Sequence, residues 1–487
     1  MKNANLLFIL LISFYLGSLT TSCKKDSSGP NKASEIDQFI WYNMASYYLW
    51  ADSVPKLSTA YFQNDTNKLN SFLAGYSDHK QLFSDLLYKY GTVDRFSWIE
   101  SDYTTLQNEL QGITSTMGMD FRLALLSDGS SIVGIVRYVF KNSPAEKAGI
   151  KRGSLFLKIN GQQLTTSNYQ SLLSATSFNM TLATVSNNML YTGATTSTMT
   201  AVQMQENPVL LDSVYSVSNK KIGYLVYNGF YSDFDVQLNN VFAKFKTKGI
   251  TDLVLDLRYN GGGSIQSAIY LASMIYGPYT SKTFVNLQFN KTLQDYYNQQ
   301  YGSNFFVSNF IDTIGRTSTT PTTQINALNL SQLTVITSSG TASASELIIN
   351  GLKPYMPVYI VGDTTVGKNV GSMTLIDYNH PTNKWAMQPI VMRLTNSLGK
   401  SDYSKGFVPN STLVEDYTNL QPFGSLNDPL LSNAINHING VAAKSYQISR
   451  AQTMGMKEFM SRKDMIPHAN EMYFNPKQLK FKPNLLK

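Results

Sequence analysis

A serine within a run of small residues is the first candidate for chemistry in this sequence. The segment 338–346 reads SSGTASASE; it follows a predicted strand over 333–337 and opens a predicted apolar helix over 343–352. A strand, a tight turn and a helix present side chains at the carboxyl edge of a sheet, where α/β proteins place their sites. Ser343 and Glu346 also have the S-x-x-E spacing of a helix capping box. Ser343 is therefore a candidate nucleophile or a helix cap, and the two roles are compatible.

Two glycine-rich turns follow other predicted strands. Residues 362–369 (GDTTVGKN) nearly match the phosphate-binding pattern G-x-x-x-x-G-K-[ST], but Asn369 replaces the hydroxyl residue that would bind magnesium. The residues after it alternate as in a strand, whereas a phosphate loop opens a helix, so we do not expect nucleotide binding. Residues 260–263 (NGGG) do open a predicted helix. Their N–H groups could bind a phosphate or a developing oxyanion.

The histidines do not suggest a site. None of the four lies near a glycine–serine segment, and no pair has metal-ligand spacing: His79, His380, His437 and His468. A Ser-His-Asp triad would require distant parts of the chain to fold together. We therefore expect no metal site and no cofactor.

Three separated segments, in this order, resemble the tail-specific, or C-terminal processing, peptidases: DLVLDLRYNGGG (252–263), SSGTASASELI (338–348) and VGDTTVGKNVGS (361–372). Shorter stretches such as DRFSWI (94–99) extend the resemblance over about residues 35–440. In this family a serine nucleophile works with a lysine base, which implies Ser343 and Lys368. The resemblance also implies oxyanion donors, namely the N–H of Gly262, with Gly261 as the alternative, and the N–H of Ala344.

The implied base needs a physical explanation, because an ordinary lysine is protonated near neutral pH. Serine is a weak nucleophile without an adjacent base, and lysine can serve only where burial lowers its pKa. Lys368 follows Gly367 and lies between two strand-like segments, which favours a buried position. Some family members have an Asp or Gln near the dyad, but the corresponding positions here are Pro354 and Ser372. The sequence leaves open whether Ser372, a candidate supporting residue like Glu346, orients Lys368.

Residues 105–204 resemble a PDZ domain. The segment 143–164 (SPAEKAGIKRGSLFLKINGQQL) has the short helix ending in A-G, the strand and the N-G turn of that family. PDZ domains add an extended peptide C-terminus to a strand edge and bind its carboxylate on a glycine-containing loop. The resemblance places four residues at that loop: Met117, Gly118, Met119 and Phe121. Gly118 would allow the close approach of the ligand, so we expect polypeptide substrates captured through unstructured C-termini.

The amino terminus has the pattern of a lipoprotein signal peptide. Lys2 precedes an almost wholly apolar run over 6–16 (LLFILLISFYL), which is too short to span a membrane comfortably. Small and hydroxyl residues then lead to Cys23, the one cysteine of the sequence, which resembles an acylation site. We expect export and lipid anchoring to a Gram-negative membrane, facing the periplasm or the cell surface. The alternative is a soluble secreted protein with a leftover thiol.

Composition indicates a globular chain with several domains. The 487 residues are 43% hydrophobic and 15% charged, and the net charge is +8. Lysine and arginine are scattered outside the C-terminal stretch 477–487, so we do not expect a nucleic-acid partner. From about residue 210, strands and helices alternate, which predicts a largely parallel sheet.

These observations predict an α/β multidomain protein. The expected parts are a signal peptide (1–22), a flexible tether (23–34), an N-terminal helical domain (35–104), a β-rich PDZ domain (105–204), an α/β catalytic domain with a mostly parallel sheet (205–440) and a basic C-terminal extension (441–487). The predicted function is that of a membrane-anchored serine endopeptidase. The alternative is a non-catalytic lipoprotein that binds peptides or apolar ligands. The pair Ser343 and Lys368 favours the enzyme, because a pure binding protein need not keep both.

Overall fold

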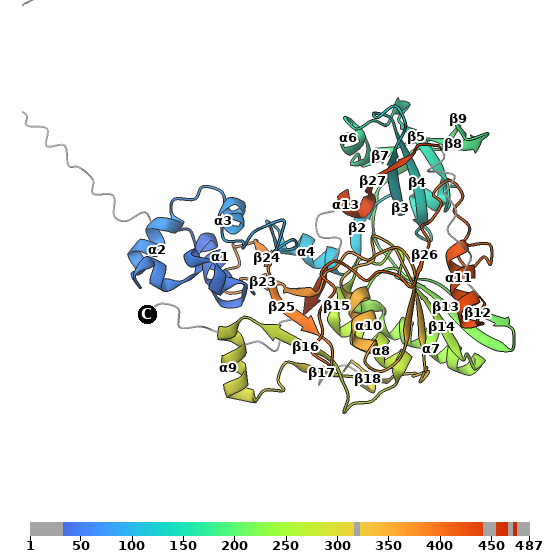
Figure 1. Cartoon of the computed structure of the whole chain (residues 1–487). Coiled ribbons are helices and arrows are strands. Elements are labelled where there is room, and N and C mark those ends of the chain that lie inside the picture. The colour runs from blue at the N-terminus through green and yellow to red at the C-terminus, as the bar shows by residue number, and fades with distance from the viewer. Residues whose placement is uncertain (1–32, 316–321, 442–453, 466–470, 475–487) are drawn as a thin grey trace, which may run out of the picture.

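The computed structural model describes residues 33–315, 322–441, 454–465 and 471–474 (Figure 1). The predicted signal peptide and Cys23 lie outside the described residues. Among the helices in these ranges, none combines the length and the apolar character needed to cross a bilayer.

The N-terminal domain is helical, as predicted. It contains the helices α1 (Glu35–Tyr47), α2 (Thr66–Leu73), α3 (His79–Asp85) and α4 (Tyr103–Leu110), with the 3-10 turns η1 (Ala51–Ser53), η2 (Pro55–Leu57) and η3 (Thr59–Phe62). The first three helices each begin at a side-chain cap, because Ser34, Asp65 and Asp78 accept a hydrogen bond from an N–H of the first turn. Buried apolar residues of these helices join the main core of the catalytic domain, so the two domains share one apolar interior.

The PDZ domain is built on an antiparallel sheet with strand order β27-β3-β4-β5-β8-β9. Its strands are β3 (Met119–Leu125), β4 (Ile132–Val139), β5 (Leu155–Ile159), β6 (Gln162–Gln163), β8 (Met180–Ser186), β9 (Met189–Thr195) and β27 (Lys457–Ser461). The helices are α5 (Pro144–Lys147) and α6 (Tyr169–Leu173), and two small strand pairs flank the sheet: β2 (Ile113–Thr116) with β11 (Val202–Gln205), and β7 (Ser177–Phe178) with β10 (Met199–Thr200). The helix, strand and turn expected after Ser143 are present. The edge strand β27 comes from the C-terminal extension and was not expected.

The catalytic domain contains a mostly parallel sheet, as predicted, with strand order β12-β13-β14-β20-β21-β26. The strands are β12 (Val209–Val217), β13 (Lys220–Tyr227), β14 (Asp252–Asp256), β20 (Leu333–Thr337), β21 (Val358–Gly362) and β26 (Ser411–Thr412), and only β12 pairs antiparallel with its neighbour. One face is covered by α7 (Asp235–Lys248), α8 (Ile265–Tyr276) and α10 (Ala344–Leu352), and the other face by α11 (Pro429–Ile438). Both faces are therefore apolar, which explains the near-continuous hydrophobic runs of these strands.

A second sheet lies beside the first, with strand order β15-β28-β22-β25-β16-β17. Its strands are β15 (Gly263–Ser264), β28 (Met472–Phe474), β22 (Val370–Met373), β25 (Ile390–Thr395), β16 (Thr283–Phe289) and β17 (Val307–Asn309). The remaining elements are η4 (Ser232–Phe234), α9 (Lys291–Tyr301), α13 (Arg462–Met465), β18 (Thr313–Ile314) and β19 (Thr323–Gln324), and a small sheet of β1 (Trp98–Glu100), β24 (Ala386–Gln388) and β23 (Leu375–Ile376). This small sheet joins the N-terminal domain to the catalytic domain.

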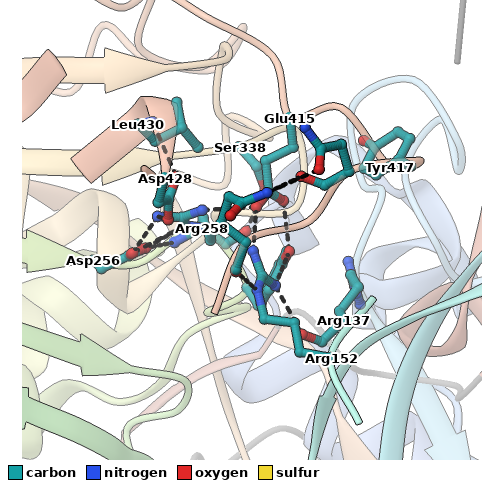
Figure 2. Close-up of polar contacts among 12 residues, drawn as sticks. Arg137, Arg152, Asp256, Arg258, Ser338, Glu415, Tyr417, Asp428 and Leu430 are labelled. Atoms are coloured by element: carbon teal, nitrogen blue, oxygen red, sulfur yellow. Dashed lines mark hydrogen bonds and ion pairs between the residues drawn. The ribbon is translucent and has the colours of Figure 1, made fainter. Parts of the chain in front are cut away.

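A buried network of charged groups joins the PDZ domain to the parallel sheet (Figure 2). Arg258, just after β14, is fully buried and forms ion pairs with Asp256, Glu415 and Asp428. Arg152, from the PDZ domain, contacts the same Glu415 at 2.7 Å. Burial by itself would raise the pKa of Glu415, but the two guanidinium groups lower it to about 2. The network therefore holds the PDZ domain against the strand that leads into the glycine turn.

Candidate active site

Ser343 lies in the turn between β20 and α10, at the position that the sequence predicts. Its backbone φ is +67°, a conformation that residues with side chains rarely adopt. Its side chain is fully buried, and its Oγ has no hydrogen-bond partner within the described residues. Strained backbone of this kind occurs at functional turns, where surrounding contacts hold it in place. Ser343 is thus held at the carboxyl edge of the sheet with an uncommitted hydroxyl.

Lys368 lies between β21 and β22, and its side chain is fully buried. Its Nζ is 4.7 Å from the centre of the Phe96 ring and 3.3 Å from Oε2 of Glu471. Burial lowers the pKa of Lys368 below its ordinary value, while the carboxylate of Glu471 opposes that shift. Burial therefore favours the neutral, proton-accepting form of this lysine.

Glu346 brings the two residues together. It is fully buried in the first turn of α10, and its Oε2 accepts hydrogen bonds from the backbone N–H of Ser343 and of Lys368, each at 2.8 Å. Its Oε1 accepts from the N–H of Gly367 at 2.7 Å and from the hydroxyl of Thr365 at 2.5 Å. The expected contact between Glu346 and the Ser343 backbone is thus present, and the same carboxylate also fixes the loop that carries Lys368.

The glycine turn lies against Ser343. A Cβ added to Gly262 would be 2.6 Å from both Cβ and Oγ of Ser343, so only glycine fits at this position. The N–H of Gly262 donates to Oδ1 of Asn260 at 2.8 Å, whereas the N–H of Gly263 donates to the backbone carbonyl of Glu471 at 2.5 Å. The N–H of Gly263 is thus engaged in the pairing of β15 with β28, and the oxyanion role of Gly262 or Gly261 stays a prediction.

The second expected oxyanion donor, Ala344, is the first residue of α10. The first N–H groups of a helix have no acceptor within the helix and are available to an anion. Ala344 is fully buried beside Ser343. Its position fits the predicted role.

Of the two accessory positions, Ser372 lies in the site and Pro354 does not. Ser372, on β22, donates from Oγ to Oε2 of Glu471 at 2.9 Å and accepts from Nε2 of Gln388 at 2.9 Å. Ser372 and Lys368 therefore meet at one carboxylate oxygen. Pro354 follows the C-terminal end of α10, at the end of the helix opposite Ser343.

Glu471 is the part of the site that sequence reasoning missed. It is buried, and besides Lys368 and Ser372 it binds Nε1 of Trp98 through Oε1 at 3.0 Å. Burial raises the pKa of Glu471, and Lys368 opposes that rise. Nothing in the basic C-terminal extension singles out this residue. Phe96 and Trp98 belong to the DRFSWI stretch, which resembles the family. That resemblance does not assign either residue a role in the site.

The predicted PDZ loop is shorter than expected, because β3 already begins at Met119 and contains Phe121. Gly118 has φ of +78°, and a Cβ there would be 2.1 Å from Cβ of Ser143. Packing against the start of α5 therefore requires glycine here by itself, and the approach of a ligand at this position stays a prediction. Met117, Met119 and Phe121 line a cavity of about 280 Å³ together with Arg462.

The described histidines contact residues other than Ser343 and Lys368. His79 contacts Asp37 at 2.7 Å, and His380 contacts Asp377 at 2.6 Å. His437 stacks on Tyr359 with ring centres 3.4 Å apart, and His468 lies outside the described residues. In the part of the chain that the structure describes, no three His, Cys, Asp or Glu side chains are grouped so that they could hold a metal ion.

Three family models match this chain: peptidase family S41 over residues 221–411, the peptidase S41 N-terminal domain over 35–98, and a PDZ domain over 135–184. A "Probable CtpA-like serine protease" of Staphylococcus aureus (strain COL) is 23% identical over 72% of this chain and 59% of its own length. A protein of the same description from Staphylococcus epidermidis is 23% identical over 48% of this chain and 42% of its own length. The chain thus spans less than two thirds of these relatives.

A similar solved structure supports the fold. A crystal structure described as "Putative S41 protease from Bacteroides fragilis NCTC 9343" has a TM-score of 0.63 and 26% identity, and the match covers 83% of this chain and 97% of that one. Along the chain, the match to the N-terminal domain comes first, the PDZ match second and the peptidase match third. Together with the geometry of the Ser343 turn, these matches show that the chain belongs to peptidase family S41.

Proposed function

We propose that this protein is a serine endopeptidase that cleaves polypeptides through an acyl-enzyme, with Ser343 as nucleophile and Lys368 as general base. One observation carries the proposal: a single oxygen of the buried Glu346 accepts the backbone N–H of both residues. A strained serine and a desolvated lysine whose backbones share one carboxylate oxygen supply the parts that base-assisted attack by a hydroxyl requires. Family membership supports the same chemistry.

The chemical steps follow from these positions. The neutral amine of Lys368 accepts the hydroxyl proton as Oγ of Ser343 attacks the substrate carbonyl. Backbone N–H groups stabilise the oxyanion: that of Ala344 at the start of α10, and that of Gly262 or Gly261, as the family resemblance implies. The protonated lysine then transfers its proton to the leaving amine. Water, deprotonated in turn by the lysine, attacks the acyl-enzyme, and the lysine returns that proton to Oγ of Ser343 as the ester bond breaks.

The proposal also covers the kind of substrate and the cellular location of the protein. The PDZ domain would capture unstructured polypeptides, including their C-termini, because such domains add an extended chain to a strand edge. The signal-peptide pattern before Cys23 supports export and lipid anchoring to a Gram-negative membrane.

Labelling with an active-site serine probe, a fluorophosphonate, tests the enzymatic proposal. We expect the parent to react, while Ser343→Ala and Lys368→Ala each lose labelling and cleavage of an unstructured protein. Ser339→Ala and Lys405→Ala are the matched controls, because both side chains are exposed, and they should behave as the parent does. Labelling or cleavage that survives Ser343→Ala would refute the assignment.

A further inference from the structure

Two described pieces of the C-terminal extension lie on the two regions that would bind a polypeptide. β27 pairs antiparallel with β3, which begins at Met119 directly after Gly118, and Figure 1 shows it at that edge of the PDZ domain. β28 lies between β15, which begins at Gly263, and β22, which carries Ser372, and it is parallel to both strands. The same extension therefore reaches the PDZ edge and the candidate active site.

The contacts of β27 are those of a peptide added to a sheet edge. Backbone pairing with β3 is continuous from Lys457 to Ser461 apart from one irregularity, and it supplies affinity without regard to sequence. Side chains add specificity: Phe459 packs edge-on against Tyr169 of α6 at 5.3 Å, and Glu458 forms an ion pair with Arg122 of β3. β27 thus occupies the edge at which a PDZ domain takes its ligand.

The backbone next to β28 lies beside Ser343. The backbone carbonyl of Glu471 accepts the N–H of Gly263. Its oxygen lies 2.5 Å from the position that a Cβ on Gly262 would take, and Oγ of Ser343 lies 2.6 Å from the same position. A carbonyl about to be attacked by Ser343 must occupy this region. The extension therefore fills the space into which the scissile carbonyl of a substrate would enter.

The side chain of Glu471 also acts against the base. Its carboxylate forms an ion pair with Nζ of Lys368, and a nearby negative charge stabilises the ammonium form of a lysine. An ammonium group cannot accept the proton of the serine hydroxyl. Ser372 and Trp98 hold the carboxylate in this place.

We propose that β27 and β28 form a tethered substrate mimic, which occupies the PDZ edge and the active-site cleft together and holds the enzyme inactive until a polypeptide displaces it. The proposal rests on the peptidase function proposed above and adds its regulation. Because both strands are linked to the protein, each binds at a high effective concentration, and the loss of one weakens the hold of the other. A substrate that competes for the PDZ edge would therefore also help to open the active site.

The first test compares full-length variants on one unstructured protein substrate. Phe459→Ala removes the anchor on α6, and Glu471→Gln removes the charge beside Lys368. We expect the double variant to raise kcat/KM at least tenfold, mainly by lowering KM, and each single variant to raise it by less. Lys457→Ala, an exposed change on the same strand, should stay within twofold of the parent. A double variant that is unchanged or less active would overturn the proposal, because the extension would then be a permanent part of a working site.

The second test does not depend on catalysis. A fluorescent synthetic peptide with the sequence 454–474 is titrated into full-length protein carrying Ser343→Ala, with and without the Phe459→Ala and Glu471→Gln changes. We expect at least tenfold tighter binding to the protein with the changed extension, because its two sites can be vacated. Equal affinity of the peptide for both proteins, or no binding to either protein, would overturn the proposal. Absence of labelling and cleavage in every variant would instead refute the peptidase function, and the peptide titration would still decide whether the extension can be displaced.

Discussion

Removing the carboxylate of Glu346 is the perturbation that most directly tests how this site is held together. In Glu346→Ala, three backbone N–H groups lose their acceptor, those of Ser343, Gly367 and Lys368. Each buried N–H without a partner costs about 1–3 kcal/mol. Water can enter the space left by the side chain, so the low end of that range applies to each group. We therefore expect the free energy of unfolding to fall by about 3–5 kcal/mol.

The effect on reactivity should exceed the effect on folding. Once the carboxylate is gone, the strained turn at Ser343 and the loop at Lys368 are free to move apart. A misplacement of about 1 Å can cost on the order of 100-fold in rate. We expect serine-probe labelling, measured well below the unfolding transition, to slow by about that factor. Glu346→Gln keeps the size and one acceptor, so it should fall between the parent and the alanine variant.

The assays are urea unfolding followed by circular dichroism and the rate of fluorophosphonate labelling. The matched control is Glu146→Ala, because Glu146 also accepts a backbone N–H in the first turn of a helix but lies exposed on α5. It should cost no more than about 1 kcal/mol and leave labelling unchanged. A Glu346→Ala protein with parental stability and labelling would refute the reasoning.

Three further predictions concern the base, the PDZ loop and the anchor. In a pH profile of kcat/KM, the value should rise through neutral and mildly alkaline pH as Lys368 loses its proton. Glu471→Gln should move this rising limb to lower pH, because the substitution removes a carboxylate that raises the pKa of the lysine. A rising limb that lies wholly below about pH 6 in the parent would indicate another base. Gly118→Val brings a Cβ within 2.1 Å of Cβ of Ser143, so differential scanning calorimetry should show Tm lowered by roughly 5 °C or more. Cleavage activity should fall in parallel on long and short substrates. A loss of activity confined to long substrates would instead indicate a pure docking role. Cys23→Ala should move the protein from the membrane to the soluble fraction with its cleavage activity retained, and a variant that still sediments wholly with membranes would contradict lipid anchoring at this residue.

Local patterns were sufficient for much of the fold. The turn that carries Ser343 was predictable because a buried strand, small residues and an apolar helix occur within one short stretch of sequence. The parallel sheet followed from alternating strands and helices, and the PDZ helix from its proline and glycine positions. These signals are local, since capping, turn formation and hydrophobic periodicity depend on residues only a few positions apart.

The use of Gly118 shows where a local interpretation stops. The sequence indicated correctly that a glycine belongs in this loop. It could not distinguish a glycine needed by a ligand from one needed by Ser143, because both demand a residue without Cβ. Only the position of the following helix reveals the packing requirement.

By itself, the sequence determined the identity and order of the segments, the candidates Ser343 and Lys368, and the need for burial to make a lysine a base. Tertiary structure alone decided how these groups meet. Glu471 contacts Lys368 from 103 positions along the chain and Ser372 from 99, and β27 joins a sheet whose other strands end more than 250 residues earlier. Pairing with a distant strand depends on exposed backbone N–H and C=O groups. Every residue except proline possesses both groups, so no pattern of residue types predicts which strand will pair. The physical reason is that backbone hydrogen bonding is nearly independent of sequence, whereas the strain and burial at the nucleophile are encoded by the residues next to it.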